Sequence, residues 1–445
     1  MEPQVATSDA VDTAVPDAAA RGGLDLRSCV YAAIGGALCG GLAVLFRLAL
    51  GVAEDAYGDL ISTAYSFPDD GWVLPFLVFC PLGALTGWLT FRFAPEASGS
   101  GIPHVEDVLA TGGVMRWRVL LPVKFLGGLC GLGGGMSLGR EGPTVQMGAA
   151  ISEALAQRFG VTPPLRRALI AAGAGAGLTA AFNAPLAGFV FVLEELRLEA
   201  SALTYGTGLI ATVTANLVIQ VGLGPGAIFS VGAAPLLPST ALWLFACLGV
   251  ATGLAGVLFN RGIVQSLDLF ARWRSGLRLY HTTAAAAVVA LVAWWFPDAI
   301  GGGEQVAERL LRSEFSVAEP LRYLALLVSI KFLLTLVCYG SGAPGGVFAP
   351  LLVIGATLGA IVGQLAEPFF PDAAVTPALA MAGMVGMLTA SVRVPVTGVV
   401  LILEMTNGQH HLLEFTIAGL VAYLVSTGLG ERPIYETLME RDFSR

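Results

Sequence analysis

Charged side chains are scarce in this chain of 445 residues, since Asp, Glu, Lys and Arg together make up only 13% of it. A soluble globular protein carries about twice that share. Hydrophobic residues account for 55% of the chain, and the mean hydropathy is +0.75. The formal net charge of −8 provides no basic surface, so we expect no nucleic-acid partner. The composition predicts a polytopic membrane protein surrounded by the lipid bilayer.

The usual sequence signatures of metal sites and disulfide frameworks are also missing. The six cysteines are scattered through apolar segments without a C-x-x-C pair, and the four histidines form no H-E-x-x-H motif. We therefore expect no cofactor, and we interpret the cysteines as small residues of the core.

The chain divides into a tail, a membrane domain and a short end segment. Residues 1–25 are acidic and rich in Ala and Pro, which predicts a disordered tail. A transmembrane domain is predicted over 26–440, and a C-terminal cytoplasmic segment over 431–445. Some apolar segments, such as 394–406, are too short to cross a bilayer, which is typical of helices that stop inside the membrane. Arginines near both ends of the chain predict that both termini are cytoplasmic.

An internal repeat divides the membrane domain into halves at about 28–225 and 236–430. Internal repeats are typical of secondary transporters, which bind their substrate where the repeats meet. Hydropathy leaves open whether the two halves are parallel or inverted. The matching segments are Lys124-Phe125-Leu126 with Lys331-Phe332-Leu333, Gly139 with Gly346, Pro143 with Pro350, and Leu193-Glu194 with Leu403-Glu404.

Three segments share one design, a turn of small residues followed by a proline at or near the start of a helix. Glycine lets the backbone approach an ion closely, and a helix start supplies unpaired N–H donors. Helix starts that converge therefore form an anion site without a full positive charge, so the ion is also able to leave. The segments are Gly99-Ser100-Gly101-Ile102-Pro103, Gly139-Arg140-Glu141-Gly142-Pro143 and Gly346-Val347-Phe348-Ala349-Pro350, of which the last two are mates in the repeat.

Glu141 is an acid flanked by strongly apolar sequence. An ionisable residue at the bilayer centre costs about 2.5–3.5 kcal/mol, so such residues usually face the protein interior and carry function. Pro143 suits the first turn of a helix, which places Glu141 just before a helix start where backbone amides favour negative charge. Its carboxylate and an anion would then compete for the same donors. The alternative is an ordinary Arg140–Glu141 loop at the membrane interface, and Ser100 is alternatively an ordinary N-cap.

In their order and spacing, the three motifs resemble those of the CLC family of chloride channels and proton/chloride exchangers. The likeness covers about residues 30–440. It implies an all-α polytopic membrane fold with two inverted repeats of tilted and partial helices, and a homodimer with one pore in each subunit. The chain ends ten residues after Tyr435, from which we expect a compact prokaryotic form in a bacterial inner membrane.

The resemblance also implies roles for individual residues. Ser100 matches the serine of the central anion site, and Glu141 matches the glutamate that gates the pore from outside and accepts a proton. Tyr435 matches a tyrosine that closes the site from inside, although without the family it would be interpreted as an interfacial aromatic anchor. The implied anion-binding set is Ser100, Gly101, Ile102, Glu141, Gly142, Val347, Phe348, Ala349 and Tyr435.

Glu194 and Glu195 follow an apolar helix and would by default be a solvated helix end, with Arg197 pairing locally. In the family, however, Glu195 matches the internal proton-transfer acid of the exchangers. This favours chloride/proton exchange over a passive voltage- or pH-gated chloride channel. The pattern at Ser100 and Tyr435 implies selectivity for chloride, with bromide and nitrate as further passengers. His104 departs from the family pattern without touching the site.

Two readings from other classes remain. An intramembrane serine hydrolase would use Ser100 as its nucleophile, but no histidine base is evident, since His104 is four residues away and His281 lies near a basic loop. A purely structural membrane protein would leave the three helix-start motifs and the two acids, Glu141 and Glu195, unexplained. We therefore expect a transporter of chloride and protons rather than an enzyme.

Overall fold

Helices account for nearly all regular structure in the computed structural model, which describes residues 23–67, 69–229, 237–272, 278–312, 321–370 and 375–443. The predicted tail lies almost entirely outside these residues. The helices of the first half are α1 (Leu26–Tyr65), α2 (Val73–Phe93), η2 (Pro95–Ala97), α3 (Ile102–Thr111), α4 (Trp117–Gly133), α5 (Glu141–Phe159), α6 (Pro163–Phe182), α7 (Pro185–Glu194) and α8 (Ala202–Leu223). Those that follow are η3 (Ser239–Ala241), α9 (Leu242–Ala271), α10 (Arg278–Trp295), η5 (Pro297–Ala299), α11 (Glu304–Leu311), α13 (Leu321–Gly340), α14 (Phe348–Ala366), η6 (Glu367–Phe369), α15 (Val375–Val392), α16 (Pro395–Thr406), η7 (Gln409–His411), α17 (Leu412–Gly428) and α18 (Ile434–Phe443).

Helix lengths are those of an integral membrane protein with broken helices. Among the described residues, eight helices are long and apolar enough to cross a membrane. Others, such as α3 and α7 with 10 residues each, are far too short to cross one. The 40 residues of α1 extend over about 60 Å, twice the thickness of a hydrocarbon core, so this helix must tilt or project beyond the core. The prediction of tilted and partial helices is confirmed.

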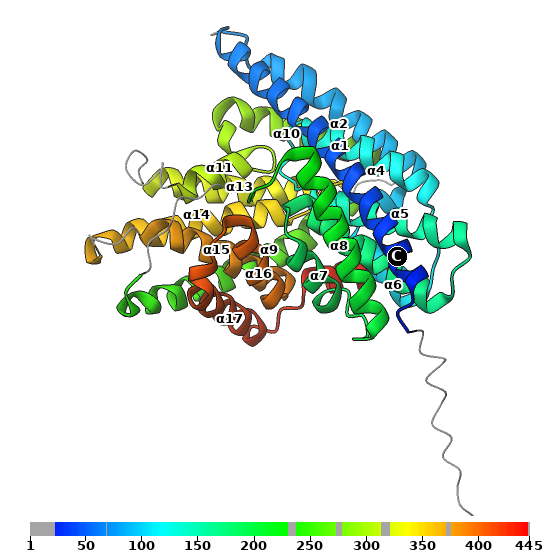
Figure 1. Cartoon of the computed structure of the whole chain (residues 1–445). Helices are drawn as coiled ribbons and strands as arrows, with labels where there is room; N and C mark the ends of the chain where they lie inside the picture. The colour runs from blue at the N-terminus through cyan, green and yellow to red at the C-terminus, as the bar shows by residue number, and fades with distance from the viewer. Residues whose placement is uncertain are drawn as a thin grey trace, which may run out of the picture.

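The two halves lie side by side, with α4–α8 mainly on the right of Figure 1 and α13–α17 on its left. In each half the tightest helix pair is built on glycine, α5 with α6 and α14 with α15. A Cβ added at Gly148 would lie 2.2 Å from the Gly173 carbonyl oxygen, and one at Gly355 would lie 2.3 Å from that of Gly383. The backbones therefore touch directly, as small residues allow between membrane helices.

A local two-fold axis relates the two halves, as a contact between two mated glycines shows. The Gly139 amide donates to the Gly346 carbonyl at 2.8 Å, and the Gly346 amide donates to the Gly139 carbonyl at 2.7 Å. This antiparallel bridge joins equivalent positions of the two halves reciprocally. Such reciprocal pairing of equivalent residues places a local two-fold axis through the bridge, as the predicted inverted repeats require.

A second reciprocal contact joins the mated short helices α7 and α16. The Glu194 carboxylate, at the end of α7, accepts from the Val396 and Thr397 amides at 3.1 and 2.7 Å. The mated Glu404, near the end of α16, accepts from the Leu186 and Ala187 amides at 3.1 and 2.8 Å. Each acid thus satisfies two amides that the first turn of the other helix leaves unpaired. The Leu-Glu match in the repeat therefore reflects the capping of each helix by the glutamate of the other.

The chain's two lysines, Lys124 and Lys331, are fully buried at mated positions. Lys124 Nζ donates to the carbonyls of Ala97 and Gly99 at 2.9 and 2.7 Å, which holds the loop that carries Ser100. Lys331 Nζ donates to the carbonyls of Ala299, Ile300 and Gly301, at 2.5 Å for Gly301.

The loop held by Lys331 is the mate of the Gly99–Pro103 motif. No mate of this motif was predicted from the sequence. Gly99 and Gly101 have φ of 62° and 83°, and Gly301 and Gly303 have φ of 64° and 85°. The signal that would have revealed the match is the pattern Pro-acid-Ala-x-Gly-x-Gly, at 95–101 and again at 297–303. The loop at 301–304 is therefore the counterpart of the Ser100 loop and is part of the structure around the site.

The cysteines follow the core prediction only in part. All six are free; Cys39 and Cys338 are buried, whereas Cys247 is exposed on α9. A thiol is apolar enough to face lipid, so burial in the protein is not required of it.

Removal of the Glu404 carboxylate should destabilise the protein, because two amides at the start of α7 lose their acceptor. For Glu404→Ala we expect a loss of about 1–2 kcal/mol, measured as a lower midpoint of thermal unfolding of the purified protein in detergent. Glu199→Ala removes an exposed acid and is the control, with an expected change below about 0.5 kcal/mol. Equal midpoints for the two variants would contradict a stabilising role of the reciprocal caps.

Candidate anion site

The Glu141 carboxylate lies at the start of a helix from the opposite repeat. Glu141 is fully buried and begins α5, while Phe348 begins α14. Glu141 Oε1 accepts from the Phe348 amide at 2.7 Å, and the Ala349 amide also faces the carboxylate. An acid of the first half thus satisfies N–H groups that α14 leaves unpaired in its first turn. A carboxylate and a small anion seek the same donors here.

Two glycines form the cradle in which the carboxylate lies. A Cβ added at Gly139 would lie 2.0 Å from Glu141 Oε2, and one at Gly346 would lie 2.2 Å from Oε1. These are the same mated glycines that form the antiparallel bridge. Glycine is required at both positions because any side chain would occupy the space of the carboxylate.

Hydroxyl groups from two further elements approach the same place. Ser100 precedes α3 and Tyr435 lies in α18, and both side chains are buried. The Tyr435 hydroxyl lies beside Ser100, yet neither hydroxyl has a hydrogen bond of normal geometry within the described part of the chain. Glu141 Oε2 is likewise buried without a partner there. Buried polar atoms are nearly always paired, so three orphans in one place indicate a site for a polar ligand.

The remaining predicted site residues lie around these groups. A Cβ added at Gly142 would lie 2.7 Å from the Ser100 carbonyl, and the Phe348 ring lies 6.0 Å from the Tyr435 ring. Gly101 and Val347 are the N-caps of α3 and α14. Ile102 and Ala349 are buried in the first turns of the same helices. The structure thus brings the nine predicted residues of the anion site together, from four elements.

Glu195 is buried rather than solvated, so the default reading of its helix end is wrong. It is 8% exposed at the C-terminal end of α7, and its carboxyl lies beside that of Glu106 on α3. Arg197 does not pair locally as expected, since it binds Glu436 of α18 at 3.3 Å.

Sequence analysis missed Glu106 as a functional candidate. Its position, four residues after the start of α3, looks like an ordinary polar position on a short helix. Only the packing of α3 against the end of α7 brings it to Glu195. The sequence contained one indication of Glu106: charged residues are scarce in this chain, and an acid within a membrane segment usually has a partner or a function.

The serine hydrolase reading finds no support in the contacts of Ser100. His104 Nδ1 lies 2.9 Å from Gln146 Nε2, and the His281 ring lies 5.3 Å from the Phe270 ring. Within the described residues, Ser100 Oγ has no base hydrogen-bonded to it.

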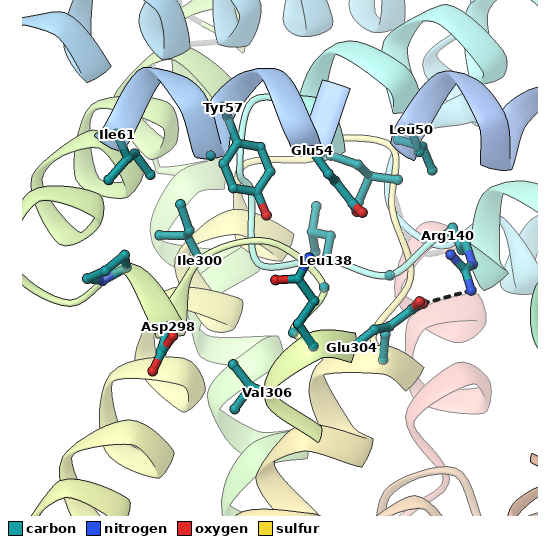
Figure 2. A pocket seen from close by; sticks show the side chains of 18 of the residues that line it. Leu50, Glu54, Tyr57, Ile61, Leu138, Arg140, Asp298, Ile300, Glu304 and Val306 are labelled. Atoms are coloured by element: carbon teal, nitrogen blue, oxygen red, sulfur yellow. Dashed lines mark ion pairs between the residues drawn. The ribbon is translucent and has the colours of Figure 1, made fainter. Parts of the chain in front are cut away.

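Two cavities reach the site from different directions and share no lining residue. The Arg140 cavity, of about 330 Å³, is lined by Gly139, Arg140 and Ala349 on the side of the Glu141 carboxylate (Figure 2). The Ser100 cavity, of about 570 Å³, is lined by Gly99, Ser100 and Gly101 on the other side. The buried site therefore separates two openings, which is the arrangement that an alternating-access path needs.

Two inverted repeats whose broken helices converge on a buried polar site are an architecture of secondary transporters. A family model described as voltage gated chloride channel matches residues 82–427 of the chain. The chain belongs to this family, the CLC family, as the three motifs predicted.

Individual relatives agree with the family match. The chain is 37% identical over 413 residues to an H(+)/Cl(−) exchange transporter of Vibrio cholerae, covering 91% of this chain and 87% of that protein. It is 38% identical over 381 residues to one of Yersinia pestis, covering 84% and 79%. The crystal structure of a slow cyanobacterial Cl−/H+ antiporter superimposes with a TM-score of 0.88 at 34% identity, covering 95% of this chain and 99% of that one.

The glycine cradle supplies a test of the site geometry. In Gly139→Ala, the new methyl group would meet only the flexible end of Glu141, so we expect the carboxylate to be displaced while the fold is kept. Chloride flux into liposomes should become less dependent on pH, by about twofold or more across pH 5–7. Gly41→Ala, where an added Cβ meets nothing within 4 Å, is the control. A pH dependence equal to that of the control would contradict the cradle.

Proposed function

We propose that this chain exchanges chloride for protons across the membrane, with Glu141 as the gate. The observation that carries the proposal is the position of the Glu141 carboxylate on the Phe348 amide, beside the unpaired hydroxyls of Ser100 and Tyr435. The names of the relatives support exchange rather than passive conduction, because they are described as exchange transporters and antiporters. The substrates are then chloride and protons, and no cofactor takes part.

The gate follows from competition between two anions for the same amides. Ionised Glu141 occupies the donors at the start of α14 and excludes chloride from them. Protonation makes the carboxyl a weaker acceptor, so the side chain leaves towards the Arg140 cavity and chloride takes its place. Chloride and proton occupancy are therefore linked thermodynamically, each favouring the other. The backbone amides, Ser100 and Tyr435 hold chloride through dipoles alone, which allows release.

Glu195 is the proposed internal acid for protons. Its burial and its position beside the Glu106 carboxyl support this role, because two neighbouring buried carboxyl groups cannot both ionise easily, which favours retention of a proton. Two residues after Glu195, Arg197 pairs with Glu436 of α18 at 3.3 Å. Protons would reach Glu195 from the cytoplasm by a route separate from the Ser100 cavity.

The setting of the transporter is proposed from the family. The protein is a homodimer with one pore per subunit in a bacterial inner membrane, with both termini in the cytoplasm. The Ser100 cavity then faces the cytoplasm and the Arg140 cavity faces outside. Chloride is the main substrate, with bromide and nitrate also carried. The division into a tail at 1–25, a membrane domain at 26–440 and an end segment at 431–445 stays a prediction.

The gate is tested with Glu141→Gln and Glu141→Ala in proteoliposomes in which chloride and pH are recorded together. Neither side chain titrates, so we expect chloride flux to persist without proton movement and without dependence on pH. A passive channel would move no protons in the wild-type protein either, and its reversal potential would ignore a pH gradient. Coupled proton transport that survived Glu141→Ala would refute the assignment.

The internal acid is tested with Glu195→Gln in the same assay. Proton flux should fall at least about tenfold, since a positioned proton-transfer group contributes about 10²- to 10⁴-fold, while chloride flux remains. Glu199→Gln, an exposed acid four residues further on, is the control and should leave both fluxes intact. Loss of both fluxes in Glu195→Gln would instead indicate a structural role.

A further inference from the structure

The residue before the proposed gate is held by an ion pair that the family motifs do not include. Arg140 binds Glu304, at the start of α11, with 2.9 Å between Nη2 and Oε1 (Figure 2). The Arg140 side chain is only 11% exposed, and its guanidinium also faces the Ala181 carbonyl at 3.3 Å. Among the residues that the structure describes, this largely buried guanidinium is paired with one carboxylate, that of Glu304.

Glu304 is fixed in place by its backbone rather than by its own side chain. It follows the loop whose carbonyls are bound by Lys331, and the Gly301 amide donates to the Gly135 carbonyl at 2.7 Å. A Cβ added at Gly303 would lie 2.8 Å from Val353 Cγ2, so the loop is packed directly on α14. On the helix itself, Val306, Ala307, Leu310 and Leu311 are buried. The carboxylate is therefore presented to Arg140 from a rigid support.

Other charges also act on this pair and on the gate. Asp298 and Arg309, further along the same cavity, pair with each other at 2.6 Å. The groups facing the Arg140–Glu304 pair are Arg47, Glu54 and Tyr57 of α1, with Asp298 of η5 and Arg309 of α11 along the same cavity. Those facing the Glu141 carboxyl are Arg140 and Tyr435.

We propose that Glu304 is a positioning residue that sets the proton affinity of the Glu141 gate by holding and neutralising Arg140. The inference rests on the proposed function. A bare guanidinium beside the gate would stabilise ionised Glu141, which keeps the gate closed until the pH is lower. The ion pair holds the guanidinium on Glu304 and thereby keeps it from pairing with Glu141, so the gate binds its proton at higher pH. Glu304 is the mate of Ile102, which carries no charge. This effect on the proton affinity of the gate therefore exists only on the Arg140 side of the site.

The test is the pH midpoint of chloride flux in proteoliposomes, measured for the wild type and for Glu304→Gln. The variant should keep its maximal flux, while its midpoint moves to lower pH by about half a unit, the size expected when a partly exposed ion pair is broken. Glu304→Asp keeps the charge and should restore the wild-type midpoint. Glu308→Gln, on the same helix and paired with Arg312, should not move the midpoint.

A double-mutant cycle shows whether Glu304 acts through Arg140. In an Arg140→Gln background, Glu304→Gln should shift the midpoint by less than about a third of the shift in the wild type. An equal shift in both backgrounds, or equal midpoints for Glu304→Gln and Glu308→Gln, would overturn the inference. The wild type and Glu141→Ala are measured first, because failure of the proposed function appears there as a missing proton flux or a persisting pH dependence, whereas failure of this inference appears only in the Glu304 variants.

Discussion

The antiparallel contact between Gly139 and Gly346 is the constraint on which the rest of the site depends. It fixes the start of α5 against the start of α14, so the Glu141 side chain has the first amides of α14 directly in front of it. Because both residues of the bridge are glycines, the space beside the backbone is left to the carboxylate. A buried acid is costly in a membrane, and here the cost is offset by helix-start donors from the opposite repeat.

The inverted symmetry explains why two adjacent acids have different roles. Glu194 has a mate in Glu404, and the two cap each other's helices, so this acid belongs to the scaffold that joins the repeats. Glu195 has Met405 at the mated position, and its carboxyl meets Glu106 instead. Glu194 is therefore satisfied by backbone amides of the other repeat, whereas Glu195 lies beside a second carboxyl group.

Much of this arrangement was predictable from sequence, because helix-start motifs carry their own geometry. Gly-x-x-x-Pro segments define where a helix begins, and the repeat established which of these starts are mates. The direction of the halves could not be predicted from hydropathy, which does not change when a helix is reversed; only the resemblance to the family implied inverted repeats. Glu106 and Glu304 were missed for another reason: each meets its partner only through the packing of helices far apart in the chain. The mate of the Ser100 loop was not predicted because the number of residues that separates the two loops differs from the number that separates the other mated motifs.

The direction of transport requires that a symmetric scaffold be made asymmetric, and the mated positions show where this happens. Glu141 has Phe348 as its mate, Ser100 has Gly302, and Ile102 has Glu304. On one side of the bridge, Ser100 provides a hydroxyl and Ile102 an apolar residue at the helix start. On the other side, Glu304 provides a carboxylate that is bound to Arg140. The backbone of both loops is the same, held by a buried lysine in each case. The two sides of the site, towards the Arg140 cavity and towards the Ser100 cavity, therefore differ in the side chains at equivalent positions. The backbone folds of the two halves do not distinguish them.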